Sequence, residues 1–156
     1  MNKDNLKKAI CYMILYVFSG CLYVLIEYLY RGRSDICMFV LAGFVGLFIA
    51  LLNNTLFEFD TDYFIQVIAA TVYCIWCEWM CGLCINMDYS IWDYRNVWGA
   101  LPWTHYQVCI PFCFAWFFIC MWGLPLMDVL QYKMRIAERP YYRFKLINNK
   151  KYYIVK

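Results

Sequence analysis

Four cysteines, two tryptophans and a glutamate lie in the eleven residues CIWCEWMCGLC, which run from Cys74 to Cys84. Paired C-x-x-C motifs are typical of zinc and iron–sulfur sites, where thiolates surround one point. On a helix, spacings of three, four and three residues place all four cysteines on one stripe. The first and the last then lie about 15 Å apart along the helix axis, which is too far for one ion. We therefore predict a helix-packing surface that binds no metal and no cofactor.

Two alternatives to a packing surface remain open. The cysteines could face lipid, because free cysteine behaves as a small apolar residue. They could also form a metal or redox site shared between subunits. The chain has ten cysteines but only one histidine, His105, so it offers few other ligands for such a site.

The glutamate within this run is more informative than the cysteines. Glu78, Gly82 and Asn86 recur at every fourth position, and Gly20 and Glu27 share a face of an earlier apolar segment. A carboxylate at membrane depth costs about 3 kcal/mol or more unless it is paired, protonated or facing water. These polar residues either join helices or line a pathway for a substrate or ions, and the two interpretations are compatible. The candidate pathway residues are Glu27, Glu78, Asn86 and Gln107.

Four apolar segments must position these residues, at about 9–30, 36–54, 64–87 and 107–128. A bilayer core about 30 Å thick requires about 20 helical residues to cross it. The chain is 65% hydrophobic and 16% charged, whereas a soluble domain is about 45–50% apolar and about 25% charged. A chain of 156 residues has no outer layer to cover four such helices. The sequence therefore predicts an all-α integral membrane protein, a four-transmembrane-helix bundle over residues 1–132 with a short basic tail, 133–156.

The first segment has the basic start of a signal peptide, but it is too long and lacks a small-residue cleavage site, so we interpret it as a retained span. Basic residues predict the orientation. The two tails hold three and eight Lys or Arg residues, and the first and third loops together hold three. Both termini are therefore expected in the cytoplasm, with the protein in the cell membrane. The second loop, FEFDTDY, is acidic and lies on the same side, but acidic residues weigh little in this rule.

The basic tail contains two segments rich in β-formers, 141–147 and 151–156, separated by Asn148, Asn149 and Lys150. This pattern predicts a short β-hairpin. The alternative is a disordered tail held near anionic headgroups.

The loop between the third and fourth segments is dense in tryptophan and tyrosine, which favour the headgroup level of a membrane. Its surroundings carry a pattern that resembles the ABC-transporter permease family of type IV. The matching residues are Glu78, Gly82, Asn86, Trp92, Asp93, Tyr94, Gly99, Gln107, Cys109, Pro111, Phe112, Trp116 and Asp128.

The resemblance covers residues 74–128, and Gly20 with Glu27 extends it more loosely. The chain departs from the family at Arg95, where a serine is usual, and at Trp98, where an asparagine is usual. The cysteine run is not part of the family pattern. The resemblance implies a functional loop motif at Trp92, Asp93, Tyr94 and Gly99, and helix-packing residues at Gly20, Gly82, Trp116 and Asp128.

The resemblance also implies transport. The chain has no G-x-x-x-x-G-K-[ST] motif, so a transporter of this kind would need a separate ATPase. We expect it to contact membrane lipids and to form a homo-oligomer or to join other membrane subunits. We expect no nucleic acid partner, because the positive charge is concentrated in the tail.

Two function classes other than transport are also compatible with a small membrane protein. The alternative is a structural or signalling membrane subunit whose basic tail docks a soluble partner. A membrane enzyme is disfavoured, because neither H-E-x-x-H nor G-x-S-x-G occurs and most cysteines lie in apolar segments. We therefore predict that the chain is not an enzyme.

Overall fold

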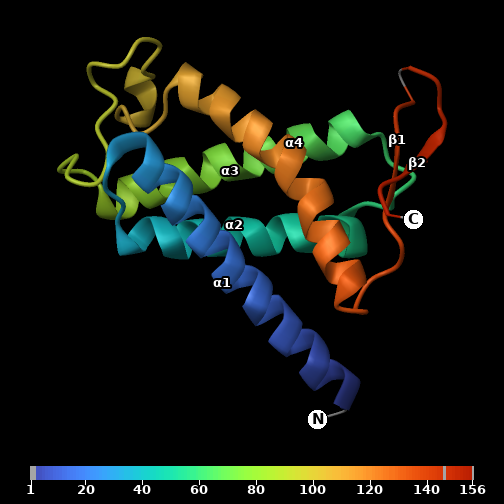
Figure 1. The fold of residues 1–156 in the computed structure, drawn as a ribbon. Coiled ribbons are helices and arrows are strands. Elements are labelled where there is room, and N and C mark those ends of the chain that lie inside the picture. Colours follow the sequence, from blue (N-terminus) through green and yellow to red (C-terminus); the bar gives the residue numbers. More distant parts are fainter. Residues whose placement is uncertain (1–2, 146, 156) are drawn as a thin grey trace.

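The computed structural model describes residues 3–145 and 147–155 (Figure 1). Its elements are the helices α1 (Lys3–Arg31), α2 (Ile36–Leu51), α3 (Tyr63–Ile85) and α4 (Ile110–Lys133), the short helices η1 (Leu52–Leu56) and η2 (Pro102–Thr104), and the strands β1 (Tyr141–Arg143) and β2 (Lys151–Tyr153).

Each predicted apolar segment forms a helix. In the described part of the chain, four helices are long and apolar enough to span a membrane, with η1 extending the second of them to 21 residues. This confirms the predicted helical membrane fold. The boundaries differ in detail: α1 begins six residues before the predicted span, and α4 begins only at Ile110 and continues to Lys133. Gln107 therefore lies in the loop before α4 rather than in the helix.

Side-chain caps explain where two of the helices begin. The Asp35 carboxylate accepts a hydrogen bond from the backbone N–H of Cys37 at the start of α2 (2.9 Å). Asp62 accepts one in the same way from Phe64 at the start of α3 (2.9 Å). Both aspartates satisfy amide groups that a helix leaves without internal partners.

Glycines bring α1 and α2 together. A Cβ added at Gly20 would lie 2.8 Å from the backbone oxygen of Phe39, and one added at Gly46 would lie 2.0 Å from the Ser19 hydroxyl. No side chain fits at such distances, so larger residues would push the two helices apart. The N-terminal end of α1 extends beyond the rest of the bundle, and residues 3–10 are exposed (Figure 1).

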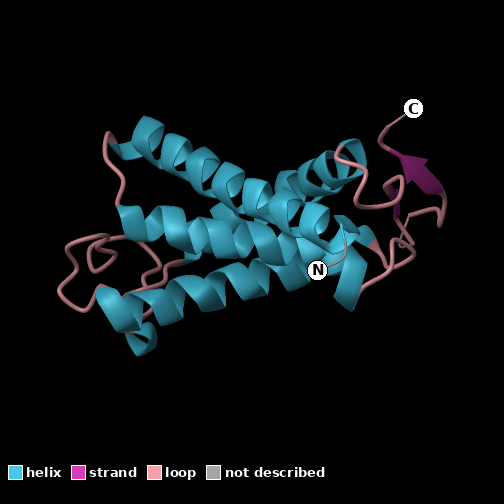
Figure 2. Ribbon diagram, turned by 90° about the horizontal axis from the view of Figure 1, so that it is seen from below, coloured by secondary structure: helices cyan, strands magenta, loops and turns pink. Residues whose placement is uncertain are grey.

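The C-terminal tail forms the predicted hairpin, with strands of three residues each. Tyr141 pairs with Tyr153 and Arg143 pairs with Lys151 in antiparallel register. The hairpin lies at the end of the bundle opposite the 86–109 loop (Figure 2). It packs against the acidic second loop, where Asp60 accepts a hydrogen bond from the Tyr141 hydroxyl (2.7 Å). The acidic loop thus has a partner in the basic tail.

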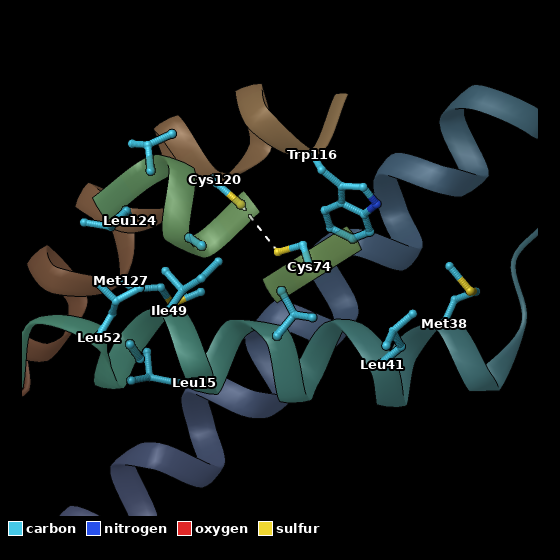
Figure 3. Packing of buried hydrophobic residues seen from close by; sticks show 14 of the residues in the cluster. Leu15, Met38, Leu41, Ile49, Leu52, Cys74, Trp116, Cys120, Leu124 and Met127 are labelled. Atoms are coloured by element: carbon cyan, nitrogen blue, oxygen red, sulfur yellow. Dashed lines mark hydrogen bonds between the residues drawn. The ribbon is translucent and has the colours of Figure 1, made fainter. Parts of the chain in front are cut away.

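The hydrophobic core runs through the middle of the bundle (Figure 3). Cys74 of α3 and Cys120 of α4 face each other there with their sulfur atoms 3.4 Å apart, and both are fully buried. Leu15 of α1 and Leu124 of α4 are also fully buried. This packing fixes α3 against α4, the two helices that carry Glu78 and Trp116.

Candidate functional site

Glu78 lies deep in α3 and is only 2% exposed. Its carboxylate accepts two hydrogen bonds, from the Tyr94 hydroxyl and from the Trp116 indole N–H, each 2.9 Å long. Both donors are uncharged, and within the described residues no salt bridge reaches Glu78. The carboxylate is therefore satisfied in its hydrogen bonds, but its negative charge has no counter-charge among the residues that the structure describes.

In the W-D-Y segment, which is Trp92, Asp93 and Tyr94, buried and exposed side chains alternate. Trp92 and Tyr94 are buried, whereas Asp93 is exposed and forms a salt bridge with Arg95 (2.7 Å). Hydrogen bonds from Arg95 lower the pKa of Asp93 to about 2. Burial, together with the nearby Glu78, raises the pKa of the Tyr94 hydroxyl, so that it stays protonated as a donor. The Asp93–Arg95 ion pair thus lies on the exposed side of the loop. The rings of Trp92 and Tyr94 are buried against the helix bundle.

Gly99 supplies a turn later in the same loop. Its φ of +73° favours glycine, and an added Cβ would lie 3.0 Å from Ile110. The Gly99 carbonyl accepts the backbone N–H of Ile110 (3.0 Å), which connects the loop to the first residue of α4.

Asn86 and Gln107 fix the two ends of the loop. The Asn86 amide donates to the Trp92 carbonyl (2.7 Å) and to the Gln107 side chain (2.9 Å). Its oxygen accepts the backbone N–H groups of Ile91 and Trp92. Gln107 donates back to the Asn86 carbonyl (3.1 Å), and its own carbonyl accepts the Trp92 indole N–H (3.2 Å). Both side chains are fully buried. The structure therefore places these two pathway candidates in one hydrogen-bond network that holds the two ends of the loop together. We call this network of Asn86, Trp92 and Gln107 the clasp.

Gly82 lies under this clasp. A Cβ added there would come within 2.5 Å of the Gln107 side-chain oxygen. Gly82 thus makes room for the loop side chain rather than for a neighbouring helix.

Glu27, near the C-terminal end of α1, forms an ion pair with a nearby residue of the same helix, Arg31. Its carboxylate accepts a hydrogen bond from Arg31 (2.5 Å) and another from the Ser34 hydroxyl. Arg31 also donates to the Ile91 carbonyl (2.7 Å), which connects α1 to the W-D-Y loop. The Glu27 charge is thus balanced by Arg31, in contrast to that of Glu78.

A cavity of about 320 Å³ lies where α1, the start of α2, α4 and the loop meet. Two aromatic pairs form much of its wall: Tyr23 stacks on Trp116 (5.3 Å between ring centroids), and Tyr94 stacks on Phe112 (4.9 Å). The full lining is Tyr23, Ile26, Glu27, Tyr30, Arg31, Met38, Trp92, Tyr94, Pro111, Phe112, Ala115, Trp116 and Ile119. Glu78 lies behind the wall, bonded to two of its rings.

The cysteine run does not converge on one point. Cys74 is buried against α4, Cys77 and Cys81 are half-buried, and Cys84 is exposed. Among residues 3–145 and 147–155, no group of three or more His, Cys, Asp or Glu side chains is arranged to hold a metal ion. Three cysteines of the run pack on or within the core, as a packing surface would.

A second buried carboxylate lies at the opposite end of the bundle. Asp128 of α4 is 2% exposed and accepts hydrogen bonds from the Asn53 amide (2.7 Å) and from the Tyr142 hydroxyl of the hairpin. One turn on, Gln131 bonds Asn54 (2.8 Å) and the Ala50 carbonyl (2.8 Å). These contacts join α4, the end of α2 with η1, and the tail.

Sequence reasoning does not find seven of the cavity residues, which are Tyr23, Ile26, Tyr30, Arg31, Met38, Ala115 and Ile119. Arg31 follows the first apolar segment, four residues after Glu27, and that spacing is a signal for an ion pair on a helix. Tyr23 and Tyr30 carry no such signal, because the segment contains other tyrosines at similar depths. The sequence predicts a packing role for Trp116, and in the structure this residue also lines the cavity.

No family model, no curated protein and no solved structure matches this chain. The resemblance to the type IV permease family therefore rests on its motif residues.

Proposed function

We propose that the chain is a membrane transport component and that the aromatic cavity binds its small substrate. The observation that carries this proposal is the convergence of the motif residues. Glu78, Trp92, Tyr94, Phe112 and Trp116 are dispersed over 39 positions of the sequence and come together at one cavity.

The chemistry of the cavity supports binding. Ligand sites are mostly apolar hollows with a few placed polar groups, and here aromatic rings surround the Glu27–Arg31 pair. An ionisable residue inside a membrane bundle is by default a candidate for function. Glu78 meets that description, because its charge has no partner among the described residues.

The remaining parts of the proposal follow from the sequence. The bundle lies in the cell membrane with both termini in the cytoplasm, in agreement with its basic tails. The chain acts as a homo-oligomer or with other membrane subunits. Energy comes from a separate ATPase, because the chain has no nucleotide-binding loop.

The alternative is a signalling subunit whose basic tail docks a soluble partner. It has less support, because two of the tail's basic residues already have a partner in the chain. Arg143 and Lys151 both lie within salt-bridge distance of Asp60, at 2.9 and 3.5 Å.

Native mass spectrometry of the protein extracted in mild detergent tests the proposal. Ala115 lies on the cavity wall and is exposed, so Ala115→Trp fills the cavity with little change to the core. Phe118→Trp is the matched control, because Phe118 is exposed on the same helix and does not line the cavity. We expect a retained small molecule in the wild type and in Phe118→Trp, and its loss in Ala115→Trp. A molecule retained equally by all three proteins, or by none, would contradict the proposal.

A further inference from the structure

We propose that the ligand of the cavity is a monovalent organic cation, and that Glu78 supplies its counter-charge through the aromatic wall. This inference rests on the proposed function and specifies the substrate class of the same site.

The first step is the charge balance. Glu27 is neutralised by Arg31 at 2.5 Å. Within residues 3–145 and 147–155, the donors to Glu78 are the uncharged Tyr94 hydroxyl and Trp116 indole N–H. A carboxylate at this depth must be protonated or balanced. The chain itself supplies no balancing cation among the residues that the structure describes, so one positive charge brought by a ligand would balance the site.

The second step is the chemistry of the wall. Cations are attracted to the faces of aromatic rings, most strongly to tryptophan, and the attraction grows when water is excluded. Tyr94 and Trp116 line the cavity and at the same time donate hydrogen bonds to the Glu78 carboxylate. Hydrogen bonds in a low-dielectric interior polarise their neighbours, so donation to an anion makes both rings richer in electrons. The negative charge of Glu78 therefore strengthens the attraction of these two rings for a cation in the cavity.

The third step separates an organic cation from a metal ion. Metal ions such as Mg²⁺ and Ca²⁺ need several oxygen ligands within about 2.0–2.6 Å. The Glu78 oxygens are almost fully covered, and the cavity surface is mainly ring and aliphatic carbon. A weakly hydrated ammonium with an aromatic or alkyl body fits this surface, and its one charge matches the one carboxylate beside the cavity that has no ion pair among the described residues.

The test compares three ligands of similar size and different charge by isothermal titration calorimetry in detergent. They are benzyltrimethylammonium, the neutral benzyldimethylamine N-oxide, and the anion phenylmethanesulfonate. We expect the wild type to bind the cation most tightly. Glu78→Gln keeps the size of the side chain, and its amide can accept from Trp116 and donate to the Tyr94 oxygen. We expect it to weaken cation binding by about tenfold or more and to leave binding of the N-oxide unchanged.

The outcomes separate this inference from the proposed function. Equal binding of all three ligands, blocked by Ala115→Trp and unaffected by Glu78→Gln, would overturn the cation assignment and leave the cavity as a substrate site. Absence of binding by all three would also overturn the assignment, and the retained-molecule experiment above would then decide the proposed function. If Glu78→Gln does not fold, Tyr94→Phe takes its place, because it keeps the ring and removes only the donor. Cation affinity equal to wild type in that variant would overturn the inference.

Discussion

Two of the buried carboxylates of this bundle, Glu78 and Asp128, have the same local chemistry and different surroundings. Glu78 and Asp128 are each 2% exposed, and each accepts hydrogen bonds from two neutral donors. The donors to Glu78 turn their rings to a cavity, whereas the donors to Asp128 belong to η1 and to the packed hairpin. The comparison shows that burial and hydrogen bonding alone do not mark a functional carboxylate. What distinguishes Glu78 is that both of its donors line one apolar, aromatic-walled cavity. Of the two donors to Asp128, Asn53 also borders a hollow, but among the described residues the wall of that hollow is mainly polar and holds no tryptophan or tyrosine.

The largest expected effect is on the loop end of the bundle. Asn86→Ala removes four hydrogen bonds and leaves four groups without this partner: the backbone N–H groups of Ile91 and Trp92, the Trp92 carbonyl and the Gln107 side-chain oxygen. At about 1 kcal/mol for each group, the free energy of unfolding should fall by about 4 kcal/mol. Denaturation in mixed micelles with increasing dodecyl sulfate measures this change. A loss below about 1 kcal/mol would show that the clasp does not hold the loop.

Asp128→Ala should have the next largest effect, and at the other end of the bundle. The Asn53 amide and the Tyr142 hydroxyl lose their acceptor, and relief of the buried charge offsets part of the loss. We expect a net destabilisation of about 2 kcal/mol and faster trypsin cleavage at Lys151, which is exposed and close to the hairpin contacts. The control is Asp93→Ala, which removes an exposed carboxylate. Unchanged cleavage at Lys151 would mean that Asp128 does not hold the tail.

Acid should loosen the hairpin by a smaller amount. A hydrogen bond from Tyr141, assisted by Arg143 and Lys151, holds the pKa of Asp60 below its ordinary value near 4. Because the folded-state pKa is the lower one, the stabilisation is complete above pH about 4 and is lost as pH falls through the lowered value. Hydrogen-exchange protection factors for residues 141–143 should therefore decrease below pH 4 and not between pH 5 and 7. In Asp60→Asn this acid dependence should disappear, and its persistence would assign the effect to another group.

Much of the fold was predictable because its signals are local. The length and hydropathy of the four apolar segments, and the β-formers on either side of Asn148, sufficed for the helices and the hairpin. The polar residues at membrane depth were also visible in the sequence. Their partners were not, because those lie in other elements. Asn86 bonds loop residues that are 5 to 21 positions away in the sequence, and Glu78 bonds Trp116 across 38 residues.

The cavity could not be predicted for the same reason. Its wall combines Tyr23 of α1, Trp92 and Tyr94 of the loop, and Trp116 of α4. Only the packing of three separate elements decides which faces of these rings remain uncovered. Aromatic residues are abundant throughout the chain, at 22%, so their type alone does not single out these four.

The most direct test of this account is the affinity for benzyltrimethylammonium of Asp128→Asn measured beside that of Glu78→Gln. Each substitution removes one buried negative charge and keeps the size of the side chain. We predict that Asp128→Asn binds the cation as the wild type does, and that Glu78→Gln binds it about tenfold more weakly or worse. Equal weakening in both variants would contradict the account, since it would mean that the two carboxylates act alike and that the cavity beside Glu78 makes no difference.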